Sequence, residues 1–312
     1  MKKTIALLCG GISAERDVSL KSGEQVFQAL NKAKYDVRRY DPQCDLPRLV
    51  ADAGDIDAAL IILHGPHGED GTVQGLLELL DIPFQGTGVL GSAVCMNKLA
   101  AKQMYATSNI PVPPAVALKR EDPVNGRALA DQLGLPLVVK PIKGGSSIGM
   151  TIVRRQEGIA AAMAKAFEQD DTALMEAYIQ GIEITGAVLG NDDPQALPLI
   201  EIIPDATHDF FDYEAKYTAG VTQEICPARI SPALTEKAQR YARMAHEALF
   251  CKGYSRTDMI VRGEDIFVLE TNTIPGMTPT SLFPQAAQAA GISFDRLLDR
   301  LIELGVEAHG RR

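Results

Sequence analysis

The sequence predicts a protein with α/β and α+β parts arranged in three lobes, and three observations carry that prediction. The 312 residues exceed the roughly 100 to 200 residues of one typical domain, so the chain has room for two or three lobes. Strand and helix patterns alternate near the N-terminus, which predicts a parallel sheet covered by helices. Farther along, strands follow one another, which predicts a small central α+β lobe and a C-terminal lobe with an antiparallel sheet.

The N-terminal lobe, residues 1–95, is predicted from apolar runs and two glycine-rich loops. A buried strand ends at Gly10-Gly11. A charged loop from His64 to Thr72 follows another buried strand, at the place where open α/β sheets bind ligands. The predicted elements are strands at 5–9, 37–40 and 58–63 and a helix at 18–30. The glycines at 86 and 88 close this lobe.

The central lobe, residues 96–180, is predicted to begin with a helix from Asn97 to Asn109, which Pro111 to Pro114 terminates. Its other elements are a hairpin of strands at 137–139 and 151–153, a helix at 157–167 and an edge strand at 174–178. The C-terminal lobe, residues 181–312, is predicted to hold strands at 183–189 and 197–202, a polar loop at 206–222, a helix at 232–249, two more strands, and helices at 281–290 and 293–304.

Composition excludes several classes of protein. Hydrophobic residues make up 46% and charged residues 23%, as in ordinary globular proteins. The net charge of −9 disfavours the broad basic surface that nucleic-acid binding needs. Five scattered cysteines, without paired spacing, indicate reduced structural thiols. No apolar run is long enough for a signal peptide or a membrane span, so we expect a cytoplasmic protein that binds neither nucleic acid nor membrane.

The most informative segment runs from Tyr254 to Asn272 and predicts a β-hairpin. A three-residue loop at 263–265 would place Asp258 opposite Glu270 and Arg256 opposite Asn272, all on one face. The other face would carry the core side chains Met259, Val261, Phe267 and Leu269. A loop one residue longer would put the two carboxylates on opposite faces, because side chains alternate along a strand.

Two carboxylates that face each other repel unless a cation lies between them. Mg²⁺ prefers oxygen ligands and typically shares one or two protein carboxylates with substrate phosphates. Asp258, Glu270 and Asn272 are therefore predicted to be metal ligands. The less favoured alternative is a solvated strand face with a chance pair of acids.

A second constellation has the chemistry of a nucleotide site. Lys140 and Lys143 flank a flexible loop of glycines and serines, which could close over phosphates or be a plain turn. Its setting between two strands rules out a Walker A loop. Lys98 could reach the same phosphates or face solvent. Glu176 and Glu183 bracket the apolar pair Tyr178-Ile179, which suits an adenosine site, although two such acids could also be surface charges.

Four further positions stand out, and each could be structural. They are Glu15 in the first glycine-rich loop, His64 in the second, Lys216-Tyr217 in the polar loop, and Ser281-Leu282 after residues 275–277. Ser281 precedes an apolar helical run, so it could cap that helix or bind a substrate carboxylate there, and the two roles are compatible.

These pieces, in this order, resemble the ATP-grasp superfamily and, within it, the D-alanine:D-alanine ligases, over essentially the whole chain. The resemblance rests on five segments, at residues 10–19, 64–72, 140–149, 212–217 and 270–277. It implies an ATP-grasp fold with ATP held between the central and C-terminal lobes. It also implies ligation of two D-alanines through a D-alanyl phosphate, for peptidoglycan precursor synthesis.

The resemblance also implies a role for each matching residue. The implied ATP ligands are Lys98, Lys140, Ser147, Glu176 and Glu183, with Tyr178 and Ile179 at the adenine. Asp258, Glu270 and Asn272 resemble the ligands of two Mg²⁺ or Mn²⁺ ions. The implied groups for the first D-alanine are Glu15 at its ammonium, Ser146 and Tyr217 as hydrogen-bonded partners, and His64 and Lys216 nearby. Arg256 and the Gly276 amide resemble an oxyanion site, and Ser281 with Leu282 resembles the clamp for the second D-alanine's carboxylate.

Alternatives within and outside this family stay open. Tyr217 favours D-alanine over D-lactate as second substrate, because relatives that form depsipeptides often have Phe or a rebuilt loop there. A D-alanine:D-serine ligase, a D-alanine:D-lactate ligase and a non-catalytic nucleotide-binding protein are the alternatives. A Rossmann dehydrogenase is disfavoured because Gly10-Gly11 lacks the glycine pattern of that fold. The resemblance further implies a homodimer.

Overall fold

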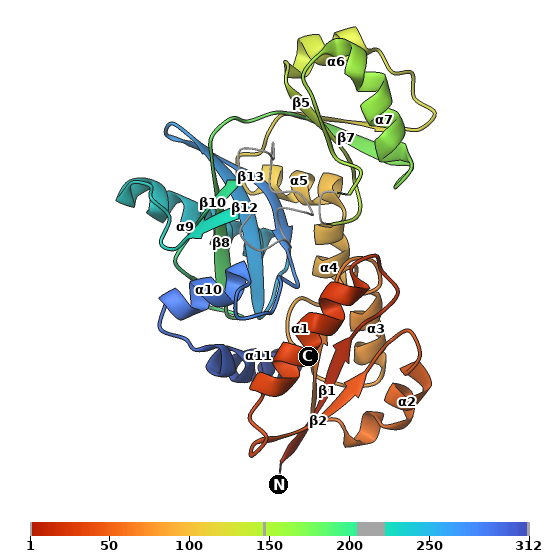
Figure 1. Cartoon of the computed structure of the whole chain (residues 1–312), viewed down its shortest axis with the longest axis vertical. Coiled ribbons are helices and arrows are strands. Elements are labelled where there is room, and N and C mark those ends of the chain that lie inside the picture. Colours follow the sequence, from red (N-terminus) through yellow and green to blue (C-terminus); the bar gives the residue numbers. More distant parts are fainter. Residues whose placement is uncertain (1, 146–147, 205–221, 311–312) are drawn as a thin grey trace.

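The structure is a computed structural model that describes residues 2–145, 148–204 and 222–310. Ser146, Ser147, Lys216 and Tyr217 lie outside the described residues. Three sheets follow one another along the long axis of the molecule, with the N-terminal sheet at the bottom of Figure 1 and the central sheet at the top.

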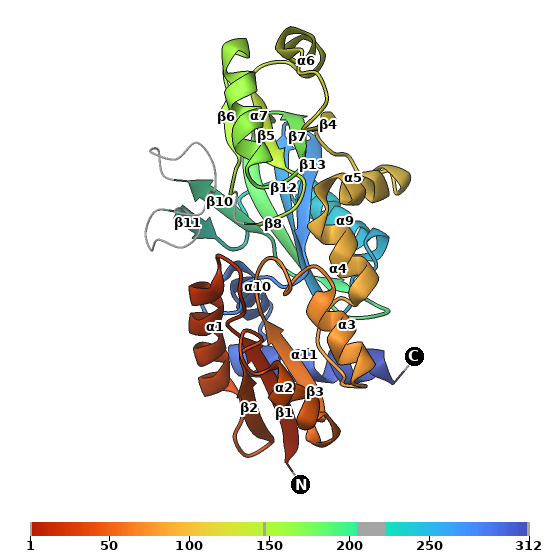
Figure 2. The same ribbon diagram turned by 90° about the vertical axis from the view of Figure 1, so that its right-hand side faces the viewer.

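The N-terminal sheet is parallel, with strand order β2-β1-β3. Its strands are β1 (Lys3–Cys9), β2 (Tyr35–Tyr40) and β3 (Ala58–Ile62), and its helices are α1 (Arg16–Ala29), α2 (Leu46–Ala51), the short η1 (Ala53–Asp55) and α3 (Thr72–Leu79). Every residue of β3 is buried, as expected for a parallel strand covered on both faces. The last helix, α11 (Phe294–His309), returns to this sheet and contacts β3 and α1 (Figures 1 and 2).

Two helices lead from this lobe to the central sheet, α4 (Val89–Met96) and α5 (Lys98–Thr107). The central sheet is antiparallel, with order β4-β7-β5-β6. Its elements are β4 (Ala115–Lys119), α6 (Gly126–Leu133), β5 (Leu137–Pro141), β6 (Thr151–Val153), η2 (Gln156–Gly158), α7 (Ile159–Phe167) and β7 (Thr172–Ala177). The prediction that β7 is an edge strand was wrong. β4, which the proline-rich segment before it concealed, pairs along its outer side.

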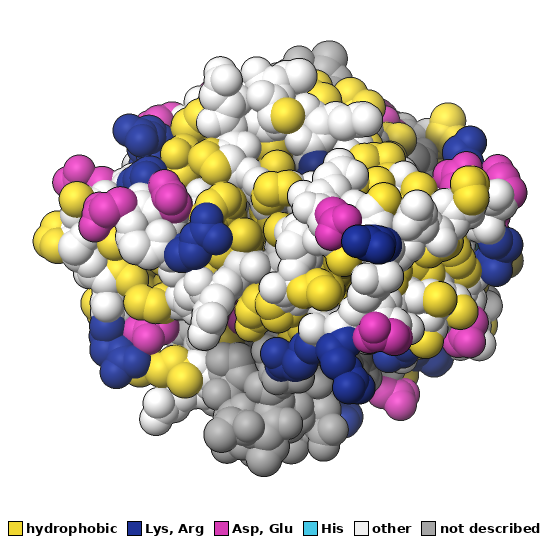
Figure 3. Space-filling view, turned by 90° about the horizontal axis from the view of Figure 1, so that it is seen from above, with side chains coloured by type: hydrophobic (Ala, Val, Ile, Leu, Met, Phe, Trp, Pro, Cys, Tyr) yellow, Lys and Arg dark blue, Asp and Glu magenta, His cyan; other side chains and the backbone are white. Residues whose placement is uncertain are grey.

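Seen from above in Figure 3, the outer surface carries basic and acidic side chains interspersed with hydrophobic ones. Neither sign covers the described part of this face. The described part of this face therefore has no broad basic patch that would attract a polyanion.

The C-terminal sheet is antiparallel, with order β11-β10-β8-β12-β13 and β9 paired to β8. Its strands are β8 (Ile182–Leu189), β9 (Gln195–Ala196), β10 (Ile200–Pro204), β11 (Thr222–Ile225), β12 (Tyr254–Arg262) and β13 (Asp265–Asn272). Helix α9 (Pro232–Ala248) packs on β8, β12 and β13, and α10 (Leu282–Ala289) follows the hairpin. One apolar core contains residues of β1, α1, α10 and α11, so the two ends of the chain share it.

The β12–β13 hairpin has the predicted pairing at its functional end and a different turn. Asp258 pairs with Glu270 and Arg256 with Asn272, as predicted. Arg262, however, pairs with Asp265, so the turn has two residues, and Gly263 adopts the positive φ of 60° that such a turn requires.

A β-bulge after Asp258 makes up for the shorter turn. The predicted core face was therefore half wrong. Met259 and Val261 are buried as predicted, but Ile266 and Val268 are the buried side chains of β13, whereas Phe267 and Leu269 are only partly buried.

The close packing of α11 on the N-terminal lobe gives a testable prediction. A Cβ atom at Gly305 would lie 2.5 Å from the backbone oxygen of Phe84, far too close for a normal contact. We expect Gly305→Ala to lower the free energy of unfolding in urea by about 1 to 3 kcal/mol, although alanine favours a helix more than glycine does. Gly126→Ala in α6 is the control, because the nearest atoms there are 3.7 Å away. Equal stability of the two variants would contradict the packing argument.

Candidate functional site

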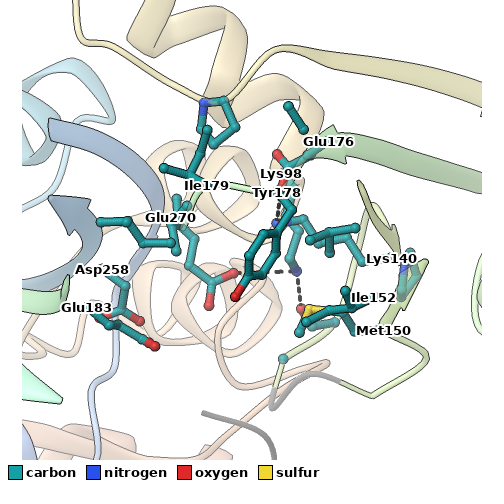
Figure 4. A pocket seen from close by; sticks show the side chains of 18 of the residues that line it. Lys98, Lys140, Met150, Ile152, Glu176, Tyr178, Ile179, Glu183, Asp258 and Glu270 are labelled. Atoms are coloured by element: carbon teal, nitrogen blue, oxygen red, sulfur yellow. Dashed lines mark hydrogen bonds and ion pairs between the residues drawn. The ribbon is translucent and has the colours of Figure 1, made fainter. Parts of the chain in front are cut away.

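Two adjoining clefts contain all the predicted site residues that the structure describes. The first lies between the central and C-terminal sheets and encloses about 960 Å³, part of it open to solvent. In Figure 4, Glu183, Asp258 and Glu270 extend into it from one side and Lys98 and Lys140 from the other. Its apolar wall includes Val138, Met150, Ile152, Ile179, Ile260 and Leu269. An apolar wall with a few charged groups is the kind of lining that a nucleotide site has.

The second cleft lies between the N-terminal loops and the open end of the β12–β13 hairpin. Its lining includes Glu15, His64, Glu69, Arg256, Asn272, Gly276, Ser281 and Leu282. Glu270 and Gly145 line both clefts. Because Glu270 borders both spaces, a group bound in one cleft can meet a group bound in the other beside this carboxylate.

A buried group of ionised side chains forms the floor of the first cleft. Glu176 Oε2 lies 2.6 Å from Lys140 Nζ, and Glu176 Oε1 lies 2.5 Å from Lys102 Nζ. The sheet register explains the first contact, since Glu176 pairs with Val138 and Lys140 is two residues farther along the same face of β5. Burial opposes the charge on Glu176, but the two ammonium groups outweigh it and lower the pKa of that carboxyl.

Lys140 and Lys102 respond differently to the same surroundings. Burial alone would lower the pKa of Lys140, but the carboxylates of Glu176 and Glu270 raise it. Burial lowers the pKa of Lys102, and Glu176 compensates only in part. Lys140 is therefore held firmly as a cation at the edge of the cleft.

Lys98 is fixed at the mouth of the same cleft by the start of α5. The Asn97 side chain caps that helix by accepting a hydrogen bond from Ala100 N at 3.0 Å. Lys98 N donates to Ile142 O at 2.8 Å, and its Nζ donates to Gly144 O at 2.6 Å. The Nζ atom also lies 3.8 Å from Glu270 Oε2. Lys98 therefore links the glycine-rich loop to the metal-ligand candidates.

Arg256 neutralises Asp258 in the structure. The guanidinium donates from Nε and Nη2 to the two carboxylate oxygens at 3.0 and 2.9 Å, and Thr185 Oγ1 donates to Asp258 Oδ1 at 2.6 Å. The Asn272 side chain is oriented by a bond that its Oδ1 accepts from Ile274 N at 3.0 Å. Asp258 lines the first cleft, Asn272 the second and Glu270 both, so the two carboxylates and the amide lie along one face of the hairpin and offer oxygen atoms as metal ligands.

This donor set fits a hard divalent cation. Within residues 2–145, 148–204 and 222–310, no three His, Cys, Asp or Glu side chains are grouped to hold a metal by themselves. Mg²⁺ does not need such a group, because it is usually held by one or two protein carboxylates, with water and substrate phosphates completing the coordination.

Three side chains crowd together at the N-terminal side of the second cleft. A Cβ atom at Gly65 would lie 3.2 Å from Glu15 Oε2, so glycine at this position leaves room for that carboxylate. Glu69 Oε2 accepts a hydrogen bond from Gly65 N at 2.6 Å. Burial, with a contribution from the Glu15 charge, raises the pKa of Glu69 to about 8. Burial also lowers the pKa of His64. The Glu15 charge opposes this shift and Arg256 adds to it, and the net lowering of the pKa favours a neutral imidazole.

Ser281 occupies the N-cap position of α10, but its side chain does not cap the helix. Its hydroxyl instead accepts a bond from Thr278 N at 3.2 Å and shares one with Thr278 Oγ1 at 2.8 Å. A Cβ atom at Gly276 would lie 3.0 Å from Ser281 Oγ, so the Gly276 backbone and this hydroxyl are neighbours. The start of α10 thus faces the second cleft, where a helix N-terminus favours a carboxylate.

Sequence reasoning missed Lys102, Glu69 and Glu224. Lys102 lies four residues after Lys98, so both lysines share one face of α5, and that spacing could have revealed it. Glu69 belongs to the predicted glycine-rich loop but was not singled out. Glu224, on β11, lines the second cleft, and burial raises its pKa. Glu224 follows the predicted polar loop, which contains several acids, and nothing in the sequence distinguishes this glutamate from them.

Comparisons with known proteins agree over almost the whole chain. The model of the D-ala D-ala ligase C-terminus matches residues 104–303, and that of the N-terminus matches residues 46–87. The chain is 65% identical to the D-alanine--D-alanine ligase of Syntrophobacter fumaroxidans over 306 residues, 98% of each chain. It is 54% identical to that of Desulfotalea psychrophila, covering 97% of this chain and 95% of the relative.

A solved structure gives the same result for the fold. The crystal structure of D-alanine--D-alanine ligase from Bacillus anthracis complexed with ATP superimposes with a TM-score of 0.87 at 36% identity, covering 99% of both chains. Across the part of the chain that the structure describes, no helix has the length and apolar character needed to cross a membrane.

The raised pKa of Glu69 predicts a specific pH dependence. Its pKa of about 8 in the folded protein exceeds the ordinary value of 4.5, so the group stabilises the folded state most at low pH, and this contribution is lost as the pH rises through about 8. We expect the melting temperature of wild type to fall relative to that of Glu69→Gln between about pH 5 and pH 9, in the presence of EDTA. The exposed substitution Glu121→Gln should follow wild type. Parallel pH curves for wild type and Glu69→Gln would contradict this assignment.

Proposed function

The chain belongs to the D-alanine–D-alanine ligase family, and from that premise we propose how its two clefts divide the work of an ATP-dependent ligase. The enzyme has the ATP-grasp fold and joins D-alanine to D-alanine with cleavage of ATP to ADP and phosphate. The family catalyses this step in peptidoglycan synthesis. The position of Glu270 between the two clefts is the observation that carries the proposal.

The first cleft binds ATP in this proposal. Tyr178 and Ile179 lie against the adenine, and Glu176 and Glu183 accept hydrogen bonds from the adenosine part. Lys98 and Lys140 bind the phosphates, because both ammonium groups face the cleft beside the glycine-rich loop. Ser147 is proposed to join them on the basis of family resemblance alone.

Asp258, Glu270 and Asn272 are proposed to hold two Mg²⁺ or Mn²⁺ ions. When bound, such ions would neutralise negative charge on the phosphates during transfer. Binding requires Asp258 to share its oxygens with a metal as well as with Arg256, which now bonds both of them. The remaining carboxylate, Glu270, lies beside Lys98 and is reachable from both clefts.

The second cleft binds the two amino acids. Glu15 accepts a hydrogen bond from the ammonium group of the first D-alanine, with neutral His64 beside it. The carboxylate of that D-alanine then takes the γ-phosphoryl group from ATP, and ADP leaves. The amine of the second D-alanine then attacks the acyl carbon, the bond from that carbon to the phosphate oxygen breaks, and phosphate leaves with the proton that the nitrogen loses. Arg256 and the Gly276 amide stabilise the oxyanion that forms in between. Ser281, Leu282 and the start of α10 hold the second carboxylate.

Several finer proposals rest on the family resemblance. Ser146, Lys216 and Tyr217 are proposed to complete the first D-alanine site, and Tyr217 favours D-alanine over D-lactate as second substrate. We also propose a homodimer, a cytoplasmic location, and a division into domains at residues 1–95, 96–180 and 181–312.

Substrate choice can be tested by phosphate release from ATP. We expect turnover with D-alanine alone, none with L-alanine alone, and no faster turnover when D-serine or D-lactate is added to limiting D-alanine. Absence of turnover with D-alanine would contradict the proposed function. Preferential use of D-lactate would leave the ligase chemistry in place and reassign the second substrate.

Glu270→Gln tests the carboxylate shared by the two clefts. The amide keeps the size of the side chain but removes the charge, so we expect kcat to fall by at least about 100-fold while the melting temperature stays within a few degrees of wild type. Glu264→Gln in the exposed turn of the same hairpin is the matched control and should retain wild-type rates. Wild-type activity of Glu270→Gln at limiting Mg²⁺ would show that Glu270 is not a ligand.

A further inference from the structure

Lys102 is a buried cation that lines neither cleft, although it touches the cleft floor. Its residue is 6% exposed, and its Nζ lies 2.5 Å from Glu176 Oε1. Apart from this contact, neither atom has a hydrogen-bond partner within the described residues. Lys140 contacts the other oxygen of the same carboxylate from the cleft side, at 2.6 Å.

The charges of these three groups explain what a second lysine changes. Lys140 and Glu176 by themselves sum to zero, so Glu176 would cancel the cation that faces the cleft. With Lys102 added, the group has a net charge of +1. Because Lys102 is enclosed, no bound phosphate can reach it directly, and its charge acts through Glu176 and Lys140. In a site shielded from water, such a charge is screened much less than on the surface.

Stability alone is a poor account of this arrangement. Removing an ammonium group from water costs more than a single contact with a carboxylate usually returns, and well-packed apolar side chains often do as well or better in such places. Helix α5 nevertheless carries Lys102 four residues after Lys98, so both lysines lie on one face of the helix. Lys98 lines the cleft, and Lys102 lies beneath the cleft floor.

We propose that Lys102 is a positioning residue for the nucleotide, and this inference rests on the proposed function of the first cleft. By occupying one oxygen of Glu176, it leaves Lys140 with an uncancelled positive charge for the triphosphate and keeps the carboxylate at a fixed place in the floor. Lys102 thereby acts on the phosphates without touching them.

Binding of Mg²⁺ with inorganic tripolyphosphate tests this role, because the probe carries the phosphate charge without the adenosine. Lys102→Met has a net charge of zero in the cleft floor, and we expect it to bind the probe about tenfold more weakly than wild type. The double variant Lys102→Met/Glu176→Gln restores a net charge of +1 and should bind within about threefold of wild type. Lys119→Met, which removes an exposed lysine at the end of β4, should bind like wild type. Titration calorimetry measures all four proteins.

The outcomes separate a charge effect from a purely structural one. If Lys102→Met binds tripolyphosphate as Lys119→Met does, or if the double variant is as weak as Lys102→Met, the proposal is wrong. Should Lys102→Met fail to fold, the comparison moves to the Glu176→Gln background, where removal of Lys102 must again weaken binding about tenfold. Equal binding there would overturn the proposal. If wild type binds neither ATP nor tripolyphosphate, the proposed function itself fails.

Discussion

The β-bulge after Asp258 is the constraint on which the rest of the site depends. With the two-residue turn and no bulge, Asp258 would pair with Leu269, and Glu270 would point with Ile266 and Val268 into the core. The extra residue reverses the alternation of β13, so that Glu270 and Asn272 share a face with Asp258 and Arg256. Both Leu269 and Glu270 then line the first cleft.

Buried hydroxyl groups behind the hairpin hold the shifted register. Thr257 Oγ1 and Thr271 Oγ1, which pair across the strands, lie 2.9 Å apart, and Tyr105 OH donates to Thr271 Oγ1 at 2.7 Å. All three residues are buried, so a slip by one position would leave these groups without partners at a cost of about 1 to 3 kcal/mol each. Tyr105 belongs to α5, the helix that also carries Lys98 and Lys102. One helix therefore fixes both the register of the metal-ligand candidates and the cations that face them.

Much of this arrangement could be predicted from sequence because it follows from periodicity. Alternation along β12 and β13 placed Asp258, Glu270, Arg256 and Asn272 on one face, and the structure confirms that pairing. The predicted turn has three residues and the observed turn has two. The pairing of Asp258 with Glu270 is nevertheless the same, because the bulge adds back the residue that the shorter turn lacks. No local pattern distinguishes the two solutions. What distinguishes them is which side chains of β13 are buried, and that depends on tertiary packing. Ile266 and Val268 share an apolar core with α9, the helix before the hairpin, and with Tyr105 of α5, which lies far away in the sequence.

Two of the residues that sequence reasoning missed, Lys102 and Glu69, have a property in common: each is coupled to the charge of a neighbouring side chain. Lys102 acts on Glu176, and Glu69 lies beside Glu15, whose charge helps to raise its pKa. A motif records groups that contact a ligand, whereas electrostatic partners can come from any element that packs nearby. Four glutamates line the second cleft with one arginine among its described residues, but the raised pKa of Glu69 leaves that side chain largely protonated near neutral pH. The first cleft is also lined by four carboxylates, those of Glu176, Glu183, Asp258 and Glu270, with Lys98 and Lys140 as its cations. The sum of the charges therefore does not distinguish the two clefts. In the proposed function they differ in where the cations lie: Lys98 and Lys140 stand beside the glycine-rich loop, where the phosphates would bind, and the carboxylate of the first amino acid would meet them beside Glu270, which lines both spaces.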